Sequence, residues 1–168
     1  LKGVALDHAE HIVGDLSLVY TPADAGMQPN FGFAAGLWEE CWNLSPDMHL
    51  HLWVKVQDVS NPPWGVRLVD SNKLEATGRL PDIKAIGEWQ ELTLALNVLQ
   101  ATSGFDWSHT SLLEFEVAFG QDARIHLDGI CFEGDGTVIG VTDKSLTQRM
   151  VEAQSSRAVR VETAFRKA

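Results

Sequence analysis

The sequence predicts an all-β protein, an antiparallel β-sandwich, and three observations support this fold class. Apolar and polar residues alternate over short segments, most regularly from Leu50 to Val56. Turn-forming residues separate these segments at intervals of ~8–15 residues. No amphipathic helix is visible before residue 140. Strands with one apolar parity must bury one face, so we expect two sheets packed through their aliphatic faces.

The first half of the chain contains three short segments and then the best-patterned one. Residues 4–6 are an apolar run, residues 15–20 alternate, and residues 31–33 place two phenylalanines on one parity. Loops with proline and glycine lie at 21–30 and 36–46. In residues 50–56 every second position is aliphatic, and the positions between them are His51, Trp53 and Lys55. We expect a central strand there.

The second half completes a set of about eight strands. Residues 64–70, 89–96 and 113–119 alternate regularly, and residues 76–80 form a shorter segment that Pro81 ends. The last segment, residues 124–132, sets Ile125 and Leu127 opposite Arg124, His126 and Asp128. After residue 140, Ser145 has the chemistry of a helix cap, so a helical or irregular tail is expected.

Charge divides the chain into a domain at 1–136 and a tail at 137–168. The first part holds 7 basic and 20 acidic side chains, and the tail holds 6 basic and 3 acidic ones. All six tryptophans lie before residue 108. We therefore place a boundary near Gly134-Asp135-Gly136 and interpret the tail as a linker or the lead into a further domain.

The net charge of −10 argues against nucleic acid and anionic membranes as partners. The longest apolar runs are too short for a membrane span. The sequence begins Leu1-Lys2-Gly3 without an initiator methionine, which suggests a mature or excised piece. We expect a secreted or periplasmic protein with a neutral or weakly charged substrate. Cys41 and Cys131 can pair or remain thiols, and the sequence does not decide between these states.

Several strands carry polar or aromatic side chains opposite their aliphatic parity. If these strands are neighbours, one face mixes indole, imidazole, guanidinium and carboxylate groups, which suits a sugar. The indole stacks on C–H faces, and the other groups hydrogen-bond hydroxyls. The alternative is a solvated outer face with a half-buried tryptophan. The candidate ligand-binding residues of this face are His51, Trp53, Arg67, Glu116 and His126.

Two loop tryptophans, Trp38 and Trp64, are further contact candidates, because Gly36 and Pro63 place them in exposed turns. The alternative, the more common role for a single loop tryptophan, is a plug at the rim of the core. For metals, calcium is the better candidate: Asp7 and Asp128, near the two ends of the domain, can meet across the sandwich with backbone carbonyls. The alternative is a solvated acidic rim.

Glu114 and Glu116 lie on one strand parity, ~7 Å apart by strand geometry. A pair of carboxylates at that distance can serve glycoside hydrolysis. No Gly-x-Ser-x-Gly motif is present, and neither cysteine lies in a recognisable nucleophile motif.

Four segments occur in an order that resembles galactose-binding-like jelly rolls: 47–56, 66–70, 87–94 (Gly-Glu-Trp-Gln-Glu-Leu-Thr-Leu) and 125–132 (Ile-His-Leu-Asp-Gly-Ile-Cys-Phe). The chain resembles carbohydrate-binding modules and the non-catalytic N-terminal domains of agarases and related enzymes over roughly residues 1–136. The closing motif of that family usually reads Leu-Asp-Asp-Ile, and Gly129 replaces its second Asp here, which weakens a calcium site carried over from the family.

The resemblance implies a jelly roll that binds polysaccharide or oligosaccharide without catalysis. We expect an accessory domain covalently linked to the catalytic domain of a polysaccharide-degrading enzyme, requiring no cofactor, with structural calcium as an option. Two alternatives remain. One is a jelly-roll hydrolase or lyase that uses the paired glutamates, and the other is a structural domain that packs its polar face on a catalytic partner.

Overall fold

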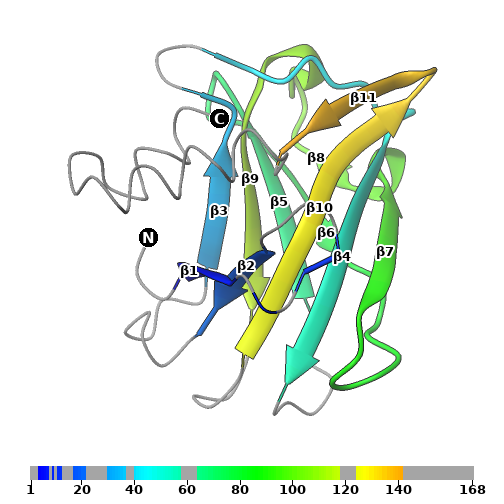
Figure 1. The fold of residues 1–168 in the computed structure, drawn as a ribbon. Coiled ribbons are helices and arrows are strands. Elements are labelled where there is room, and N and C mark those ends of the chain that lie inside the picture. Colours follow the sequence, from blue (N-terminus) through cyan, green and yellow to red (C-terminus); the bar gives the residue numbers. More distant parts are fainter. Residues whose placement is uncertain are drawn as a thin grey trace.

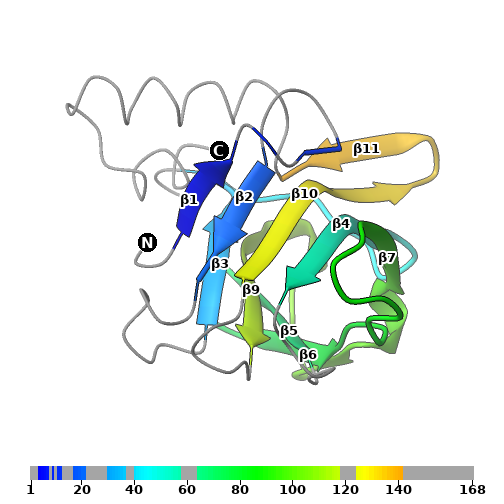
Figure 2. The same cartoon turned by 60° about the horizontal axis from the view of Figure 1, so that its bottom comes forward.

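The protein is an antiparallel β-sandwich of two sheets, as the sequence predicts (Figure 1). The computed structural model describes residues 4–7, 9, 11–12, 17–21, 30–36, 40–57, 64–117 and 124–141. Figure 2 shows the sheets as two stacked layers. The helices among these residues are two short 3₁₀ turns, η1 (Leu96–Val98) and η2 (Trp107–His109). None of the helices formed by these residues meets the length and hydropathy of a membrane span.

The two sheets are built from strands distant in sequence. In spatial order, sheet A contains β1 (Val4–Asp7), β2 (Ser17–Tyr20), β10 (Arg124–Gly134), β4 (His49–Gln57) and β7 (Gln90–Ala95), and β11 (Thr137–Gly140) also pairs with β10. Sheet B contains β3 (Asn30–Ala34), β9 (Thr110–Val117), β5 (Trp64–Asp70), β6 (Glu75–Arg79) and β8 (Gln100–Ala101). The sequence did not predict β8 and β11, which are too short to show a clear period.

Strand alternation places the core between the sheets, because successive side chains point to opposite faces. In β4 the aliphatic parity of residues 50–56 is fully buried. From sheet B, Leu68 and Phe115 are also fully buried in the same hydrophobic cluster. Each such side chain contributes about 1.5–3 kcal/mol by leaving water. The parity argument therefore identified the inward face of these strands correctly.

An aromatic cluster joins the sheets at the β2–β3 end. Tyr20 of β2 stacks on Phe31 of β3 at 4.5 Å between ring centroids. Phe31 in turn lies 5.4 Å from Phe115 of β9. Burial raises the pKa of the Tyr20 phenol above its ordinary value. These rings fix the edge strand β3 against the opposite sheet.

A β-bulge in β10 explains the glycine in the closing motif. Asp128 pairs with Trp53 and Cys131 pairs with His51, so two residues of β10, Gly129 and Ile130, oppose one residue of β4. Gly129 has φ 56°, a conformation that glycine adopts without steric cost. The left-handed backbone of the bulge therefore favours a glycine at position 129, independently of any metal.

The C-terminal boundary expected at residue 136 falls inside a hairpin. Asp135 and Gly136 form its two-residue loop, and both have positive φ, 49° and 74°. This is the Asp-Gly turn favoured in tight hairpins. Beyond it, β11 pairs with β10, and Val141 is buried and donates to the Ile130 carbonyl at 2.8 Å. The sandwich therefore extends to Val141, and the helix expected after Ser145 lies outside the described residues.

The buried parity of β4 predicts a large stability loss on truncation. We expect Leu52→Ala to lower the free energy of unfolding by about 2–5 kcal/mol, because Leu52 is completely buried and its removal leaves a cavity. Val98→Ala is the control, since Val98 is 62% exposed, and it should change stability by less than about 0.5 kcal/mol. Chemical denaturation measures both variants. Equal losses would contradict the assigned inward face.

Candidate functional site

The five strand residues expected to share one ligand-binding face do not share one. His51 and Trp53 lie in β4 and His126 in β10, all in sheet A, whereas Arg67 lies in β5 and Glu116 in β9, both in sheet B. The prediction of a single face is wrong, because the aliphatic parity of each strand points to the common core. The polar parities of the two sheets consequently point away from each other.

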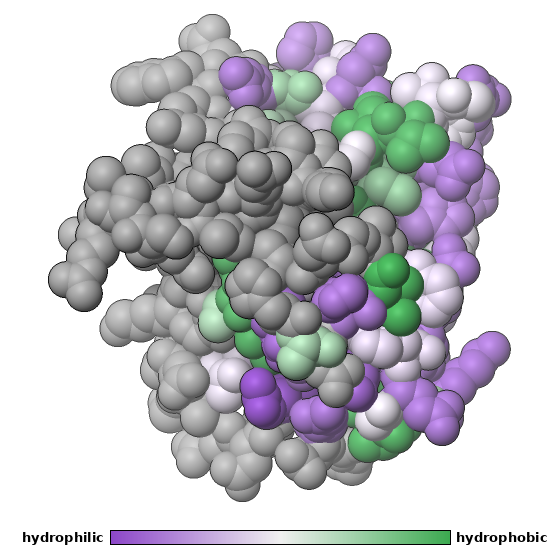
Figure 3. All heavy atoms as spheres, in the orientation of Figure 1, coloured by the Kyte–Doolittle hydropathy of each residue, from purple (hydrophilic) through white to green (hydrophobic). Residues whose placement is uncertain are grey.

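On the outer face of sheet A, His51 is held by its neighbours across the strands. Its Nδ1 lies 3.0 Å from Thr93 Oγ1 and 3.6 Å from a Glu91 oxygen on β7. Its Nε2 lies 3.3 Å from Glu133 Oε2 on β10. Over β4 and β7 this face is largely hydrophilic (right of Figure 3). Trp53 is half-buried there, between the register partners Glu91 and Asp128.

His126 is buried, with 1% of its surface exposed, although its parity is outward. The Trp89 ring meets it edge to face with centroids 6.1 Å apart. Its Nδ1 lies 3.7 Å from Asp7 Oδ2. An imidazole covered in this way cannot hydrogen-bond a sugar without rearrangement, so its place supports a packing role.

The two aspartates of the calcium hypothesis make hydrogen bonds to the backbone. Asp128 is buried, and its oxygens accept from the N–H groups of Ile12 and Gly129, each at 2.7 Å. Asp7 Oδ1 accepts from the Ala9 N–H at 2.8 Å. No group of three His, Cys, Asp or Glu residues suited to a metal occurs within the described part of the chain. Calcium binding stays a prediction.

The two cysteines are not bonded to each other. Cys131 lies on the outer face of sheet A beside His51, and Cys41 lies by sheet B. Burial raises the pKa of the Cys131 thiol, and the nearby carboxylates of Glu133 and Glu91 raise it further. The Cys131 thiol is therefore mostly protonated and unreactive at neutral pH.

On the outer face of sheet B, Arg67 lies between two carboxylates from the neighbouring strands. Its Nε donates to Glu114 Oε2 on β9 at 2.9 Å, and its Nη2 contacts the same oxygen. Its Nη1 donates to Glu75 Oε1 on β6 at 2.8 Å. The hydrogen bond to Glu114 is the main cause that raises the pKa of Arg67. The guanidinium is thus held by carboxylates from the strands on both sides of β5.

Gly32 makes room for this arrangement. It pairs with Glu114 across β3 and β9. A Cβ at position 32 would lie 2.7 Å from Glu114 Cγ and 2.6 Å from the Leu113 carbonyl oxygen. The glutamate side chain therefore depends on a glycine at the edge strand.

A groove of about 1150 Å³ crosses one end of this outer face. It reaches from the segment after β3 to the turn between β5 and β6. Four strands 4.7–4.9 Å apart give it a width of roughly 14 Å. Its floor and walls are formed by Ala34, Gly36, Glu40, Cys41, Arg67, Val69, Ser71, Asn72, Lys73, Glu75, His109, Ser111 and Leu112.

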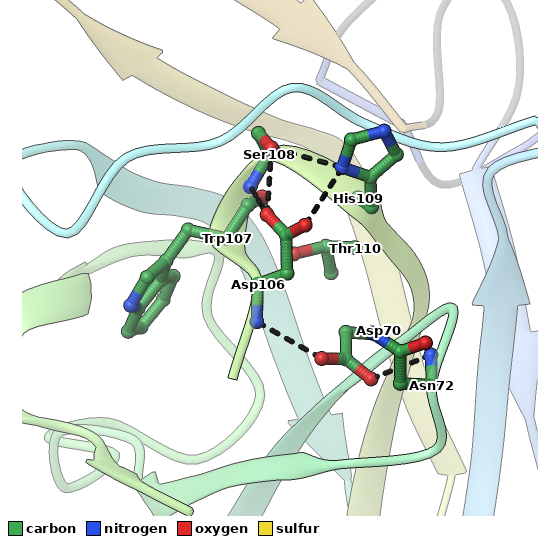
Figure 4. Close-up of polar contacts among 7 residues, drawn as sticks. All are labelled: Asp70, Asn72, Asp106, Trp107, Ser108, His109 and Thr110. Atoms are coloured by element: carbon green, nitrogen blue, oxygen red, sulfur yellow. Dashed lines mark hydrogen bonds and ion pairs between the residues drawn. The ribbon is translucent and has the colours of Figure 1, made fainter. Parts of the chain in front are cut away.

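The buried carboxylate of Asp70 holds the rim of this groove (Figure 4). Asp70 is completely buried. Its Oδ1 accepts from the N–H groups of Asn72 and Leu74 at 2.9 and 2.8 Å, which fixes the β5–β6 turn. Its Oδ2 accepts from the Asp106 N–H at 2.9 Å, which fixes the loop before β9. Because an unpaired buried carboxylate is costly, both loops are tied to one group.

Among the residues expected to bind ligand, Arg67 lies in the groove. Glu116 is exposed on the same outer face and pairs with Gly65, two residues along the strands from the Arg67–Glu114 pair. Trp64 occupies the first position of β5 and pairs with Val117. Trp38 lies outside the described residues. The roles of these side chains stay predictions.

Sequence reasoning missed most of the groove. Lys73, His109 and Ser71 lie in turns, where no periodicity marks an inward or outward side. Glu75 precedes the segment expected to be a strand. A partial signal existed, because Val69 and Leu112 have the outward parity of their strands and Asp70 ends β5 as a polar residue before a turn.

Comparison with solved structures agrees with this fold. The family 30 carbohydrate-binding module of a cellulosomal cellulase of Clostridium thermocellum matches with a TM-score of 0.60 and 15% identity, over 80% of this chain and 83% of the module. An exo-β-agarase matches with a TM-score of 0.54 and 15% identity, over 79% of this chain and 22% of that protein. The N-terminal endo-1,4-β-D-xylanase 10B of Clostridium thermocellum matches with a TM-score of 0.50 and 11% identity, over 80% of this chain and 25% of that one.

No protein-family model matches the chain, and no curated protein sequence matches it. The likeness to the solved structures establishes the fold. The chain has the jelly-roll β-sandwich of carbohydrate-binding modules, and the expectation of a jelly roll is confirmed.

The anchoring role of Asp70 predicts that Asp70→Asn lowers the free energy of unfolding by about 1–3 kcal/mol. The amide has one acceptor oxygen for three N–H donors and sets an N–H group against at least one of them. Asp82→Asn, at an exposed position, is the matched control and should be neutral. Hydrogen exchange of the Leu74 and Asp106 amides should quicken in Asp70→Asn only. Unchanged protection would remove Asp70 from this role.

The raised pKa of Cys131 predicts slow alkylation. In a Cys41→Ser background, the pH at which the rate of alkylation by iodoacetamide is half-maximal should lie above that of the same protein in urea. Glu133→Gln should lower that midpoint, because it removes a repelling carboxylate. Mass spectrometry follows the rates, and a folded-state midpoint at or below the unfolded one would contradict the assignment.

Proposed function

We propose that the protein is a non-catalytic carbohydrate-binding module that holds an uncharged polysaccharide or oligosaccharide in the groove on sheet B. The observation that carries this proposal is the open groove floored by Arg67 between two carboxylates. Fixed donors and acceptors side by side match the paired hydroxyls of a sugar ring. The groove exceeds the ~300–1000 Å³ of typical small-molecule sites, which suits a chain of several rings.

An aliphatic row lies beside the polar one. Ala34, Leu112 and Val69 are register partners across β3, β9 and β5, and all three line the groove. The described lining contains no Trp, Tyr or Phe. The C–H faces of the sugar would therefore rest on this aliphatic row, in place of the indole stacking expected on Trp53.

The charges of the groove favour a neutral ligand. Arg67 lies between the two carboxylates of Glu75 and Glu114, and of the remaining lining groups Lys73 is positive and Glu40 negative, so the groove has no excess of positive charge. The net charge of −10 for the whole chain repels polyanions at long range. Single-site affinity should be modest, with a dissociation constant in roughly the micromolar to millimolar range.

The hydrolase alternative is less well supported by the geometry. Of the two glutamates, Glu114 is bound by the Arg67 guanidinium and only Glu116 is exposed. A paired acid and base need both carboxylates available to the substrate. We therefore favour binding over catalysis at this face.

The neighbours in structure suggest the setting. Their names describe a module of a cellulosomal cellulase, an exo-β-agarase and a xylanase. By analogy, this domain would be secreted or periplasmic and would attach a linked catalytic domain to its polysaccharide. Such a module increases the effective substrate concentration at the enzyme.

The test is an affinity-gel and calorimetry screen of the 168-residue chain with cello-, xylo- and agaro-oligosaccharides. For a ligand that binds, Arg67→Met should weaken affinity at least ten-fold, since charge-assisted hydrogen bonds contribute about 1.5–3 kcal/mol. Leu112→Glu should also weaken it by placing a charge on the aliphatic row. Thermal melting confirms that each variant folds.

Trp53→Ala is the matched control on the opposite face and should leave affinity within about two-fold. Loss of binding in Trp53→Ala with retention in Arg67→Met would move the site to sheet A. Turnover of any oligosaccharide that disappears in Glu116→Gln would favour the hydrolase. A folded wild type that binds none of them would contradict the proposed function and favour a domain that packs on a catalytic partner.

A further inference from the structure

His109 stands at the rim of the groove with its ring held from one side. Its side chain is 60% exposed and lines the groove. Its Nδ1 lies 2.9 Å from Asp106 Oδ2 and 2.9 Å from Ser108 Oγ. Figure 4 shows the other ring nitrogen, Nε2, pointing away from both.

The hydrogen bonds around Asp106 determine which ring nitrogen carries the proton. Ser108 Oγ donates its single hydrogen to Asp106 Oδ1 at 2.6 Å, so towards His109 it can only accept. The hydrogen bonds from Ser108, with a smaller effect of His109, lower the pKa of Asp106. Its carboxylate is ionised at neutral pH and also can only accept. Both neighbours of Nδ1 are therefore acceptors, and Nδ1 must carry the hydrogen.

With the hydrogen on Nδ1, Nε2 of the neutral ring keeps a free lone pair, and His109 is one of the residues that line the groove. The backbone keeps it there, because the Asp106 N–H donates to the buried Asp70 carboxylate at 2.9 Å. The His109 carbonyl accepts from the Ser71 N–H at 2.9 Å, which joins the histidine to the turn that carries Lys73. This end of the groove thus offers an acceptor on His109 and, from the Lys73 ammonium, N–H donors.

We propose that His109 is a specificity-determining residue that accepts a hydrogen bond from a free hydroxyl of the bound sugar through Nε2, and that Asp106 is the positioning residue that fixes its tautomer. This inference rests on the proposed carbohydrate-binding function and defines the ligand further. The sugar at this position must carry an unsubstituted hydroxyl. A methyl ether or ester there has no hydrogen to donate, and a carboxylate would oppose the lone pair.

The tautomer can be tested without any ligand. Long-range proton–nitrogen NMR of the ¹⁵N-labelled chain at pH 8 should show His109 with a pyrrole-type Nδ1 and a pyridine-type Nε2. Asp106→Asn should shift the ring towards a mixture of tautomers, because the amide can donate as well as accept. His49, exposed on sheet A, is the internal reference and should not change. A wild-type ring protonated at Nε2 would overturn the inference.

The binding role is tested with whichever of cello-, xylo- and agaro-hexaose the wild type binds in calorimetry. His109→Leu should weaken affinity about five-fold, the equivalent of one net hydrogen bond. Asp106→Asn should weaken it about three-fold and change the NMR signature with it. His49→Leu, the matched control, should bind like the wild type, and melting temperatures confirm folding.

The outcomes separate the two proposals. Wild-type affinity in His109→Leu, with binding lost in Arg67→Met, would overturn the role of His109 and keep the groove. Binding of a fully O-methylated form of the same oligosaccharide with undiminished affinity would overturn the hydroxyl requirement. If the wild type binds none of the three hexaoses, the proposed function fails, and the ligand role of His109 fails with it, whatever the tautomer.

Discussion

The fold depends on the burial of two aliphatic sheet faces against each other. Because side chains alternate along a strand, each inward row requires an outward row, and the two outward rows of a sandwich point in opposite directions. His51 and Trp53 of β4 therefore point in the opposite direction to Arg67 of β5 and Glu114 of β9. The molecule has two chemically distinct polar faces, and the one on sheet B carries the groove.

The floor and the rim of the groove are held in place by different interactions. Its floor is formed by paired β-strands, and Arg67 is held there by carboxylates from both neighbouring strands. Its rim consists of turns, which strand pairing does not hold in place. The single carboxylate of Asp70 joins two of these turns by hydrogen bonds. The buried Asp70 carboxylate, with its three backbone N–H donors, fixes the conformation of these turns, as strand pairing does in the floor. The rim of the groove, which includes Lys73 and His109, thus depends on a completely buried residue.

A chain of hydrogen bonds connects the buried Asp70 carboxylate to the His109 ring at the surface. Asp70 anchors the backbone of Asp106, and Asp106 orients the His109 ring. Each hydrogen bond has a defined donor and acceptor. The proposed acceptor, Nε2 of His109, is therefore fixed by the protein before any ligand binds. Under the proposed function, preorganisation of this kind would lower the cost of ordering side chains when the sugar binds.

The sequence by itself determined the longer strands, their inward parity and the sandwich, because alternation with period 2 is a local property of the chain. It placed β4, β5, β7 and β10 almost to the residue. Sequence could not assign strands to sheets, since pairing is decided by contacts between distant segments. From the sequence we expected a domain boundary near Gly134-Asp135-Gly136, because the same residue types are common in turns and in linkers. The groove was decided by tertiary structure: Lys73 and His109 line it together only when β5 and β9 pair and Asp70 is buried between their loops.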